Sequence, residues 1–320
     1  MKKSRLLPLF GLALFFAVLS RLDIGTLLGL MWRANPLFMC LSLLSAALLI
    51  VLKAVKWNVL IRTFGVSYPL SKSVQAWLVG FFIGTITPGR IGDLSRAVYL
   101  GGRLKPGTAL TTVVVDRIID ITVLFAFAIG GTAVLMTTYS YADFFLTSVL
   151  FFAAFVCLAF LLTKKDAVKF VVRPVFNRIV PESHKTHFRL TFNDFYSGLN
   201  VMMKEKRRPL IASLSICVLS MFVLIFQYYF IVLSLNLDVS YQFLLLVIPV
   251  VSLLDTLPIS FSGLGVRDIS LVFFFSLLGL PAEAAVSTSV FIFFLAYVVV
   301  GLAGFAFWLK NPIRSKDIFK

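Results

Sequence analysis

Long uncharged, apolar runs alternate with short polar segments along nearly the whole chain. A helix needs about 20 mostly apolar residues to cross the hydrocarbon core of a bilayer, and several runs reach or approach that length. The pattern therefore predicts an all-α, polytopic integral membrane protein, and its 60% of hydrophobic residues leave no long soluble segment. We expect six transmembrane helices, over residues 6–20, 34–52, 109–136, 144–163, 209–237 and 284–309.

The ends of the first two runs carry additional information. Residues 6–20 follow a basic start, as in a signal peptide. The run is long for a signal peptide and does not end in a small-x-small cleavage site, which favours a retained helix. The second run is followed by Lys53, Lys56 and Trp57, which is typical of an anchor at the membrane–water interface.

Two further apolar stretches, 73–103 and 239–280, are interrupted near their middle by proline, glycine and charged residues. The first contains TITPGRIGDLSRAVYL and the second contains TLPISFSGLGVRD. Proline and glycine disfavour a continuous helix. Unwound backbone at membrane depth persists only where protein buries it or where it lines a wet cavity. We therefore treat both interruptions as candidate functional segments, formed around Pro88, Gly89, Gly92, Pro258, Gly263 and Gly265.

The distribution of basic residues predicts the orientation of the chain. The net charge is +16, and the excess lies in segments such as 53–72, 164–208 and the C-terminal tail. By contrast, segments 137–142, 236–240 and 279–283 contain no Lys or Arg. Basic loops stay on the cytoplasmic side. We therefore expect a multi-pass protein of the cell (plasma) membrane with both termini in the cytoplasm.

This orientation requires each interrupted stretch to begin and end on one side of the membrane, the first inside and the second outside. The simplest solution is two re-entrant helical hairpins that point in opposite directions, as in inverted-repeat transporters. Asp93 and Pro106 are thirteen residues apart, as are Asp268 and Pro281, which gives some support to a repeat. The alternative, two short full spans for each stretch, gives the same orientation and stays open.

A single membrane domain, residues 1–320, would then contain two halves, 1–163 and 209–320, joined by the basic segment 164–208. Apolar residues recur in this segment at helical spacing: Phe188, Phe192, Phe195, Leu199 and Met202. The spacing predicts an amphipathic helix. Two interpretations stay open, namely a helix that lies on the inner leaflet and a helix that packs against the bundle.

The charged residues at the two interruptions form the candidate substrate-binding site. Hairpin tips that meet near the middle of the membrane would bring together Arg90, Asp93, Arg96, Arg267 and Asp268. Arginine suits phosphate because its guanidinium donates two parallel hydrogen bonds. Supporting charges are expected at Asp116, Arg117, Asp120 and Asp255. The alternative is that all these charges pair with one another and only hold the hairpins in place.

Three motifs carry a family resemblance. TPGRIGDLSRAVYL, VVVDRIID and LPISFSGLGVRD, in this order, resemble motifs of the flippase-like membrane domain family. This is the family of the transmembrane domain of lysylphosphatidylglycerol synthases and of stand-alone homologues. The resemblance implies a protein that moves a lipid, or a lipid-linked precursor, between leaflets. The synthases carry a soluble aminoacyl-transferase domain after the membrane part, and here the chain stops at Lys320, so lysyl transfer is not expected. Asp268 also stands where a Glu is usual.

The expected function is translocation of an anionic phospholipid or a polyprenyl-phosphate-linked lipid. Two other classes stay open. A lipid-phosphate transferase would use Asp93 and Asp268 as acid and base, although a chain with two histidines and unpaired cysteines offers no metal cluster. A non-transporting subunit of a membrane glycosyltransferase would dock through 164–208. The expected partners are membrane lipids and a second copy of the chain. No cofactor is expected because the chain has no nucleotide-binding loop, and no nucleic acid because the basic residues are dispersed.

Overall fold

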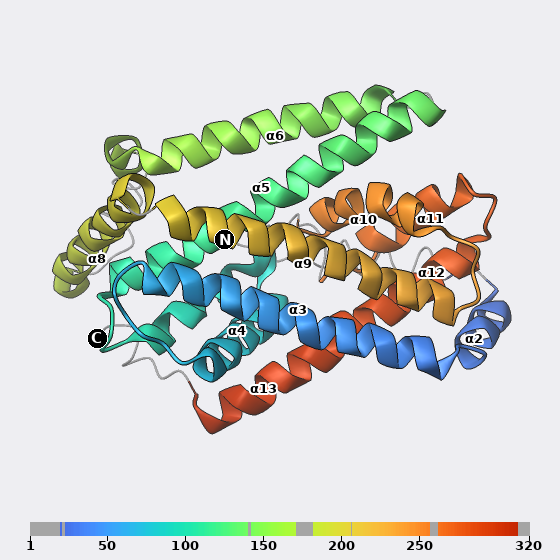
Figure 1. Cartoon of the computed structure of the whole chain (residues 1–320), viewed down its shortest axis with the longest axis horizontal. Coiled ribbons are helices and arrows are strands. Elements are labelled where there is room, and N and C mark those ends of the chain that lie inside the picture. The colour runs from blue at the N-terminus through green and yellow to red at the C-terminus, as the bar shows by residue number, and fades with distance from the viewer. Residues whose placement is uncertain are drawn as a thin grey trace.

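The computed structural model describes residues 20, 23–139, 142–170, 182–205, 207–256 and 262–312, and within them every regular element is helical (Figure 1). Five helical segments of this part are long and apolar enough to cross a membrane. They are α3 (Pro36–Arg62), α5 (Pro106–Tyr139), α6 (Ala142–Thr163), α9 (Arg207–Ser234) and the continuous run of α12 (Ala282–Ile292), η4 (Phe293–Val299) and α13 (Val300–Lys310). The expected all-α class is confirmed. The expected first span, 6–20, lies outside the described residues.

Both interrupted stretches form helical hairpins. The first consists of α4 (Leu70–Thr85) and the 3₁₀-helix η2 (Pro88–Leu100), and the second of α10 (Tyr241–Thr256) and α11 (Val266–Ser276). The longest arms have 16 residues, or about 24 Å of helix, which is short of the roughly 30 Å of a bilayer core. This length favours hairpins over pairs of full spans.

The arms of the first hairpin begin and end at the same end of the bundle. The Arg103 guanidinium donates to the Ser67 carbonyl at 3.0 Å, and the Tyr68 hydroxyl donates to the Tyr99 carbonyl at 3.2 Å. In Figure 1 the first hairpin enters from the end where α3 finishes, whereas the second enters from the opposite end, where α9 finishes. Within the bundle the two hairpins therefore point toward each other. That both re-enter the membrane from opposite sides stays a prediction.

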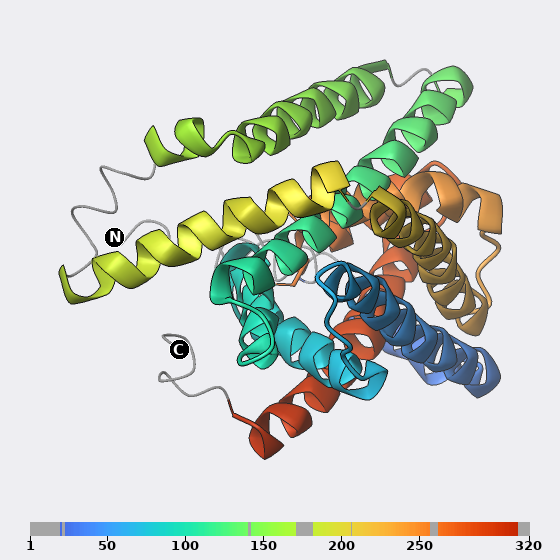
Figure 2. The same ribbon diagram turned by 60° about the vertical axis from the view of Figure 1, so that its left-hand side comes forward.

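The two halves of the chain interlock. The α4 helix of the first half packs on α13 of the second, and α10 of the second half packs on α5 of the first, while α3 runs along α9 (Figure 2). Glycines make both crossings close. A Cβ added at Gly304 would lie 2.2 Å from the Leu78 carbonyl oxygen, and one at Gly131 would lie 2.2 Å from the Leu246 carbonyl oxygen. The crossing of α4 with α13 and the crossing of α10 with α5 are therefore equally close. This similarity is expected if the two halves are inverted repeats.

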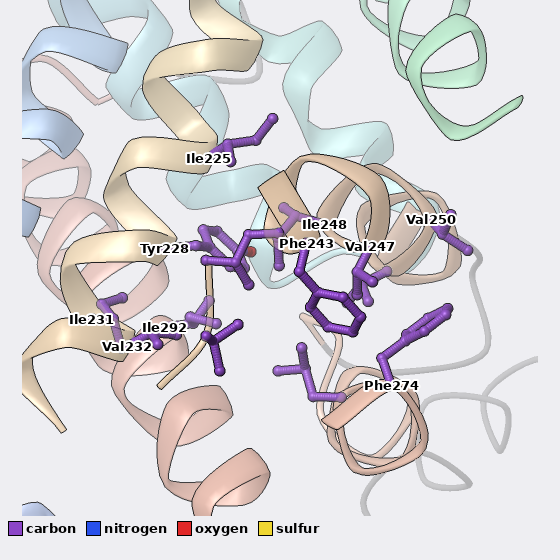
Figure 3. Packing of buried hydrophobic residues seen from close by; sticks show 14 of the residues in the cluster. Ile225, Tyr228, Ile231, Val232, Phe243, Val247, Ile248, Val250, Phe274 and Ile292 are labelled. Carbon is purple, nitrogen blue, oxygen red and sulfur yellow. The ribbon is translucent and has the colours of Figure 1, made fainter. Parts of the chain in front are cut away.

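The largest hydrophobic cluster lies beneath the second hairpin. Figure 3 shows side chains of α9 facing those of α10, with residues of α11 and α12 closing the cluster. Its labelled members are Ile225, Tyr228, Ile231, Val232, Phe243, Val247, Ile248, Val250, Phe274 and Ile292. This packing fixes α10 and α11 against the long helices, so the tip of the second hairpin has a defined position.

The basic segment contains α8 (Glu182–Asn200), whose apolar side packs against the bundle. The Thr111 hydroxyl on α5 donates to the Phe195 carbonyl at 2.9 Å. Leu199 and Met202 are buried in one cluster with Leu60 and Val115. Of the two interpretations of this segment, the structure thus supports a helix packed on the bundle.

The glycine crossings generate a stability prediction. Gly131→Ala and Gly304→Ala should each lower the free energy of unfolding by about 1–3 kcal/mol, because the added methyl group forces two helix backbones apart. Gly130 and Gly301 are matched controls, since a Cβ at either position meets nothing within 4 Å. Their alanine variants should be neutral or more stable by about 0.5–1 kcal/mol. Thermal unfolding in detergent measures the difference, and equal effects within each pair would contradict the close crossings.

Candidate functional site

The two hairpin tips border a central cavity of about 220 Å³. Side chains from α3, α4, η2, α5, α9, α10, η4 and α13 line it, so both halves of the chain contribute. On α3 the lining residues run from Ala46 to Lys53, which is near the middle of that 27-residue helix. Much of the wall is aliphatic or aromatic. The charged lining residues are Lys53, Arg90, Arg117, Asp120 and Asp255, and they are joined by Gln227, Tyr228 and Tyr297.

The two tips contact each other. The Ser262 hydroxyl donates to the Thr85 carbonyl at 3.2 Å, which joins the second tip to the last residue of α4. Both tips contain left-handed backbone, at Arg90 (φ 54°) and Ser262 (φ 50°) as well as at Gly263 and Gly265. Left-handed backbone strains a side-chain-bearing residue by roughly 1–3 kcal/mol and persists where the surrounding structure enforces it, often at functional sites. Pro258 lies outside the described residues.

Arg90 differs from the other four predicted binding residues because it lines the cavity. Its guanidinium donates to the Tyr297 hydroxyl at 3.0 Å and lies 5.4 Å from the centre of that ring. The Phe81 ring lies on another side at 5.8 Å. Among the described residues, no carboxylate forms an ion pair with Arg90. Arg90 therefore presents a positive charge to the cavity, in direct contact with the Tyr297 phenol and the Phe81 ring.

Asp93 and Arg96 instead face α5. Asp93 forms an ion pair with Arg117, and Arg96 pairs with Asp116 at 2.5 Å. Arg96 also lies 5.0 Å from the centre of the Trp57 ring. Pro88 begins η2, and the Gly92 amide donates to the Thr87 hydroxyl at 2.9 Å. These contacts attach the first hairpin to α5, in agreement with the interpretation that some of the charges hold the hairpins.

Two lysines of α3 complete a buried charge network, and they correct the expected interfacial anchor. Lys56 and Trp57 are fully buried. Lys53 and Lys56 each approach Asp120 at 2.6 Å, and Lys56 also approaches Asp116 at 3.0 Å. The spacing places the two lysines on one face of α3 and the two aspartates on one face of α5, because residues three or four apart lie side by side on a helix. It does not show that these two faces pack together.

In the second hairpin Arg267 is fully buried. Its Nε donates to the Ser289 hydroxyl at 3.0 Å, and its Nη1 lies 3.4 Å from an Asp255 oxygen. Asp268 has a different task, because its carboxylate accepts from the Gly265 amide at 2.6 Å and so caps α11. Gly263 makes room for Asp255, whose carboxylate oxygen would lie 2.5 Å from an added Cβ.

Of the five predicted binding residues, the geometry thus brings only Arg90 to the cavity wall; the supporting residues Arg117, Asp120 and Asp255 also reach it. Sequence reasoning missed Tyr297, Tyr228 and Gln227, which are single polar residues inside apolar helices and carry no motif.

Comparison with known proteins places the chain in a family. A model of the lysylphosphatidylglycerol synthase transmembrane region matches residues 6–304. The chain belongs to this family. Three UPF0104 membrane proteins are similar over nearly their whole length. The protein from Methanocaldococcus jannaschii is 22% identical, with 98% of this chain and 97% of the relative covered. The protein from Methanothermobacter thermautotrophicus is 22% identical, with 90% of each covered, and that from Pyrococcus horikoshii 23%, with 97% of each covered. The family and the polytopic membrane character are as the sequence predicted.

The contacts of Arg267 predict which carboxylate depends on it. Arg267→Ala should lower the free energy of unfolding by about 3–5 kcal/mol, because it leaves the buried Asp255 carboxylate without its partner. Adding Asp255→Asn should restore much of the loss. Adding Asp268→Ala should restore none, because it also removes the α11 cap. Thermal unfolding in detergent compares the variants, and recovery by Asp268→Ala instead of Asp255→Asn would contradict the assigned pairs.

Proposed function

We propose that this protein translocates a lipid with an anionic phosphate headgroup, such as an anionic phospholipid or a polyprenyl-phosphate-linked lipid, between the leaflets of the cell membrane. The headgroup would occupy the central cavity, and the acyl or prenyl chains would stay in the bilayer. The observation that carries the proposal is Arg90, a strained arginine without a carboxylate partner among the described residues, on the wall of a largely apolar cavity between opposed hairpin tips.

Charge balance supports a phosphate as the ligand of Arg90. The charged side chains at the cavity and the two tips are six cations and five carboxylates: Lys53, Lys56, Arg90, Arg96, Arg117 and Arg267, and Asp93, Asp116, Asp120, Asp255 and Asp268. One positive charge is in excess, which a phosphodiester bound to Arg90 would neutralise. A guanidinium suits this task because it stays charged and binds two phosphate oxygens at once.

The size of the cavity supports partial entry of the lipid. Pockets that enclose a whole drug-sized molecule measure roughly 300–1,000 Å³, and this cavity measures about 220 Å³. It would therefore hold a headgroup and leave the hydrocarbon chains outside. The hairpins, which enter from opposite ends of the bundle, would give access from either leaflet in turn, as the broken helices of inverted-repeat transporters do. Transport would be passive or coupled to an ion.

A lipid-phosphate transferase has less support. Asp93 is engaged by Arg117, Asp268 is engaged by the Gly265 amide, and neither residue lines the cavity. An acid and a base must reach the same reacting group, and these two carboxylates have structural partners instead.

The proposal predicts the effect of changing Arg90. Purified protein is reconstituted into vesicles with fluorescent phosphatidylglycerol, and the rate of lipid movement is followed by chemical quenching from outside. Arg90→Ala should lower the rate by about 10- to 100-fold, since a hydrogen bond to a charged group contributes about 1.5–3 kcal/mol. Arg90→Lys should keep only part of the rate, because a lysine ammonium lacks the planar guanidinium that binds two phosphate oxygens at once.

Arg62→Ala is the matched control, because Arg62 is exposed at the end of α3. It should leave the rate unchanged. Wild-type protein that moves no lipid, or an Arg90→Ala variant as fast as wild type, would refute the proposed role.

A further inference from the structure

Tyr297 connects the two hairpins at the wall of the cavity. On one side its hydroxyl accepts from the Arg90 guanidinium at 3.0 Å, and on the other its ring centre lies 5.2 Å from the Arg267 guanidinium. Arg267 is in turn held by Asp255 and Ser289. A chain of contacts, which we call the tip link, thus runs from Arg90 of the first tip through Tyr297 to Arg267 of the second.

The backbone around Tyr297 is itself unusual. Residues Phe293–Val299 form a seven-residue π-helix within the last transmembrane segment. π-helical turns are rare, and they occur frequently at functional sites. The Phe81 and Phe293 rings lie 6.0 and 6.2 Å from the Tyr297 ring and hold it beside the guanidiniums. The sequence therefore places an irregular helical segment at the point where the two tips are connected.

We propose that the tip link is displaceable: a lipid phosphate takes the place of the Tyr297 hydroxyl on Arg90, and the loss of this contact frees the two tips to separate. This inference rests on the proposed function and adds to it a residue that couples headgroup binding to hairpin movement.

The exchange is favourable on elementary grounds. A phenol is a neutral acceptor with one oxygen. A phosphate carries charge and can accept two parallel hydrogen bonds from one guanidinium, and this bidentate arrangement adds energy. Arg90 would therefore exchange its tyrosine for a phosphate. The left-handed backbone at Arg90 also favours the exchange, because its conformational strain would be relieved once the tip can move.

Release of Tyr297 would weaken a connection between the tips. Another connection is the hydrogen bond from the Ser262 hydroxyl to the Thr85 carbonyl. Arg267 would remain in place because Asp255 and Ser289 hold it independently of the phenol. The part of the first tip around Arg90 is thus the part that would move, while the ion pairs of Asp93 and Arg96 keep the rest of η2 on α5.

Tyr297→Phe tests the tip link because it keeps the ring over both guanidiniums and removes only the hydroxyl. If a phosphate must displace that hydroxyl, the variant should bind dihexanoyl-phosphatidylglycerol about tenfold more tightly than wild type. It should also unfold at a lower temperature in the absence of this lipid. Dihexanoylglycerol, which lacks the phosphate, should bind equally to both proteins. A tyrosine that contacted the lipid directly would give the opposite sign, namely weaker binding in Tyr297→Phe.

Two further variants make the result decisive. In an Arg90→Ala background, Tyr297→Phe should no longer change the affinity, because there is no guanidinium to release. Tyr229→Phe is the matched control, since Tyr229 packs against the Tyr241 ring away from the cavity, and it should leave the affinity unchanged. Unchanged or weaker binding in Tyr297→Phe overturns the tip link.

The two variants distinguish failure of the tip link from failure of the proposed function. If Arg90→Ala loses binding while Tyr297→Phe binds as wild type does, the phosphate site stands and only the tip link is wrong. If Arg90→Ala binds as wild type does, the phosphate site and the tip link are both wrong.

Discussion

Two helical hairpins that stop inside an apolar bundle must have their ends satisfied by protein, and this constraint governs the architecture. Each helix end leaves backbone groups without intrahelical partners, and these groups are costly to expose to hydrocarbon. Here the tips meet each other, with the Ser262 hydroxyl donating to the Thr85 carbonyl and the Asp268 carboxylate capping α11. The halves of the chain are also interlocked, because α4 of the first hairpin packs on α13 and α10 of the second hairpin packs on α5.

The buried charges of the described residues also have partners within the protein. An unpaired charge in a low-dielectric interior is strongly unfavourable, whereas a paired one is tolerated. Lys56, Arg96 and Arg267 each have a carboxylate within 3.4 Å. These pairs attach α3 and both hairpins to their neighbours. Arg90 has tyrosine and phenylalanine rings instead, so the charge that the bundle does not neutralise faces the cavity. This separates the residues that build the site from the residue that we propose binds phosphate.

Much of the fold could be predicted from the sequence, because its strongest signals are local. Uncharged runs predict long helices, and the interruptions around Pro88 and Gly265 predict hairpins, because proline and glycine act on the backbone where they stand. The i,i+3 pairing of Arg117 with Asp120 was also predictable, and the two residues lie 3.8 Å apart. The partners of the other charges depend on which helices pack together, and the sequence does not state this. Lys56 looked like an interfacial residue until α5 placed two aspartates beside it.

The site was harder to predict for the same reason. Arg90, Asp93 and Arg96 recur every three residues and share a motif, yet Arg90 lines the cavity while the other two pair with α5 residues. Asp268 looked like a partner for Arg267, but its position three residues into α11 makes it a cap. Tyr297 carries no motif, and only the π-helical segment and the meeting of both tips give it a role. When the role of a residue depends on an element that is distant in the sequence, the residues next to it in the chain do not reveal that role.

The central claim is that both hairpin tips lie near the middle of the membrane, and electron paramagnetic resonance of nitroxide labels in vesicles tests it most directly. Labels at Ile86 and Thr256, which are exposed beside the two tips, are compared by their accessibility to oxygen and to a water-soluble nickel chelate. Exposed positions on α3 provide the scale, with Leu48 near its middle and Leu37 near its start. The account predicts that both tip labels report a depth close to that of Leu48. Tip labels that report the depth of Leu37 would contradict it.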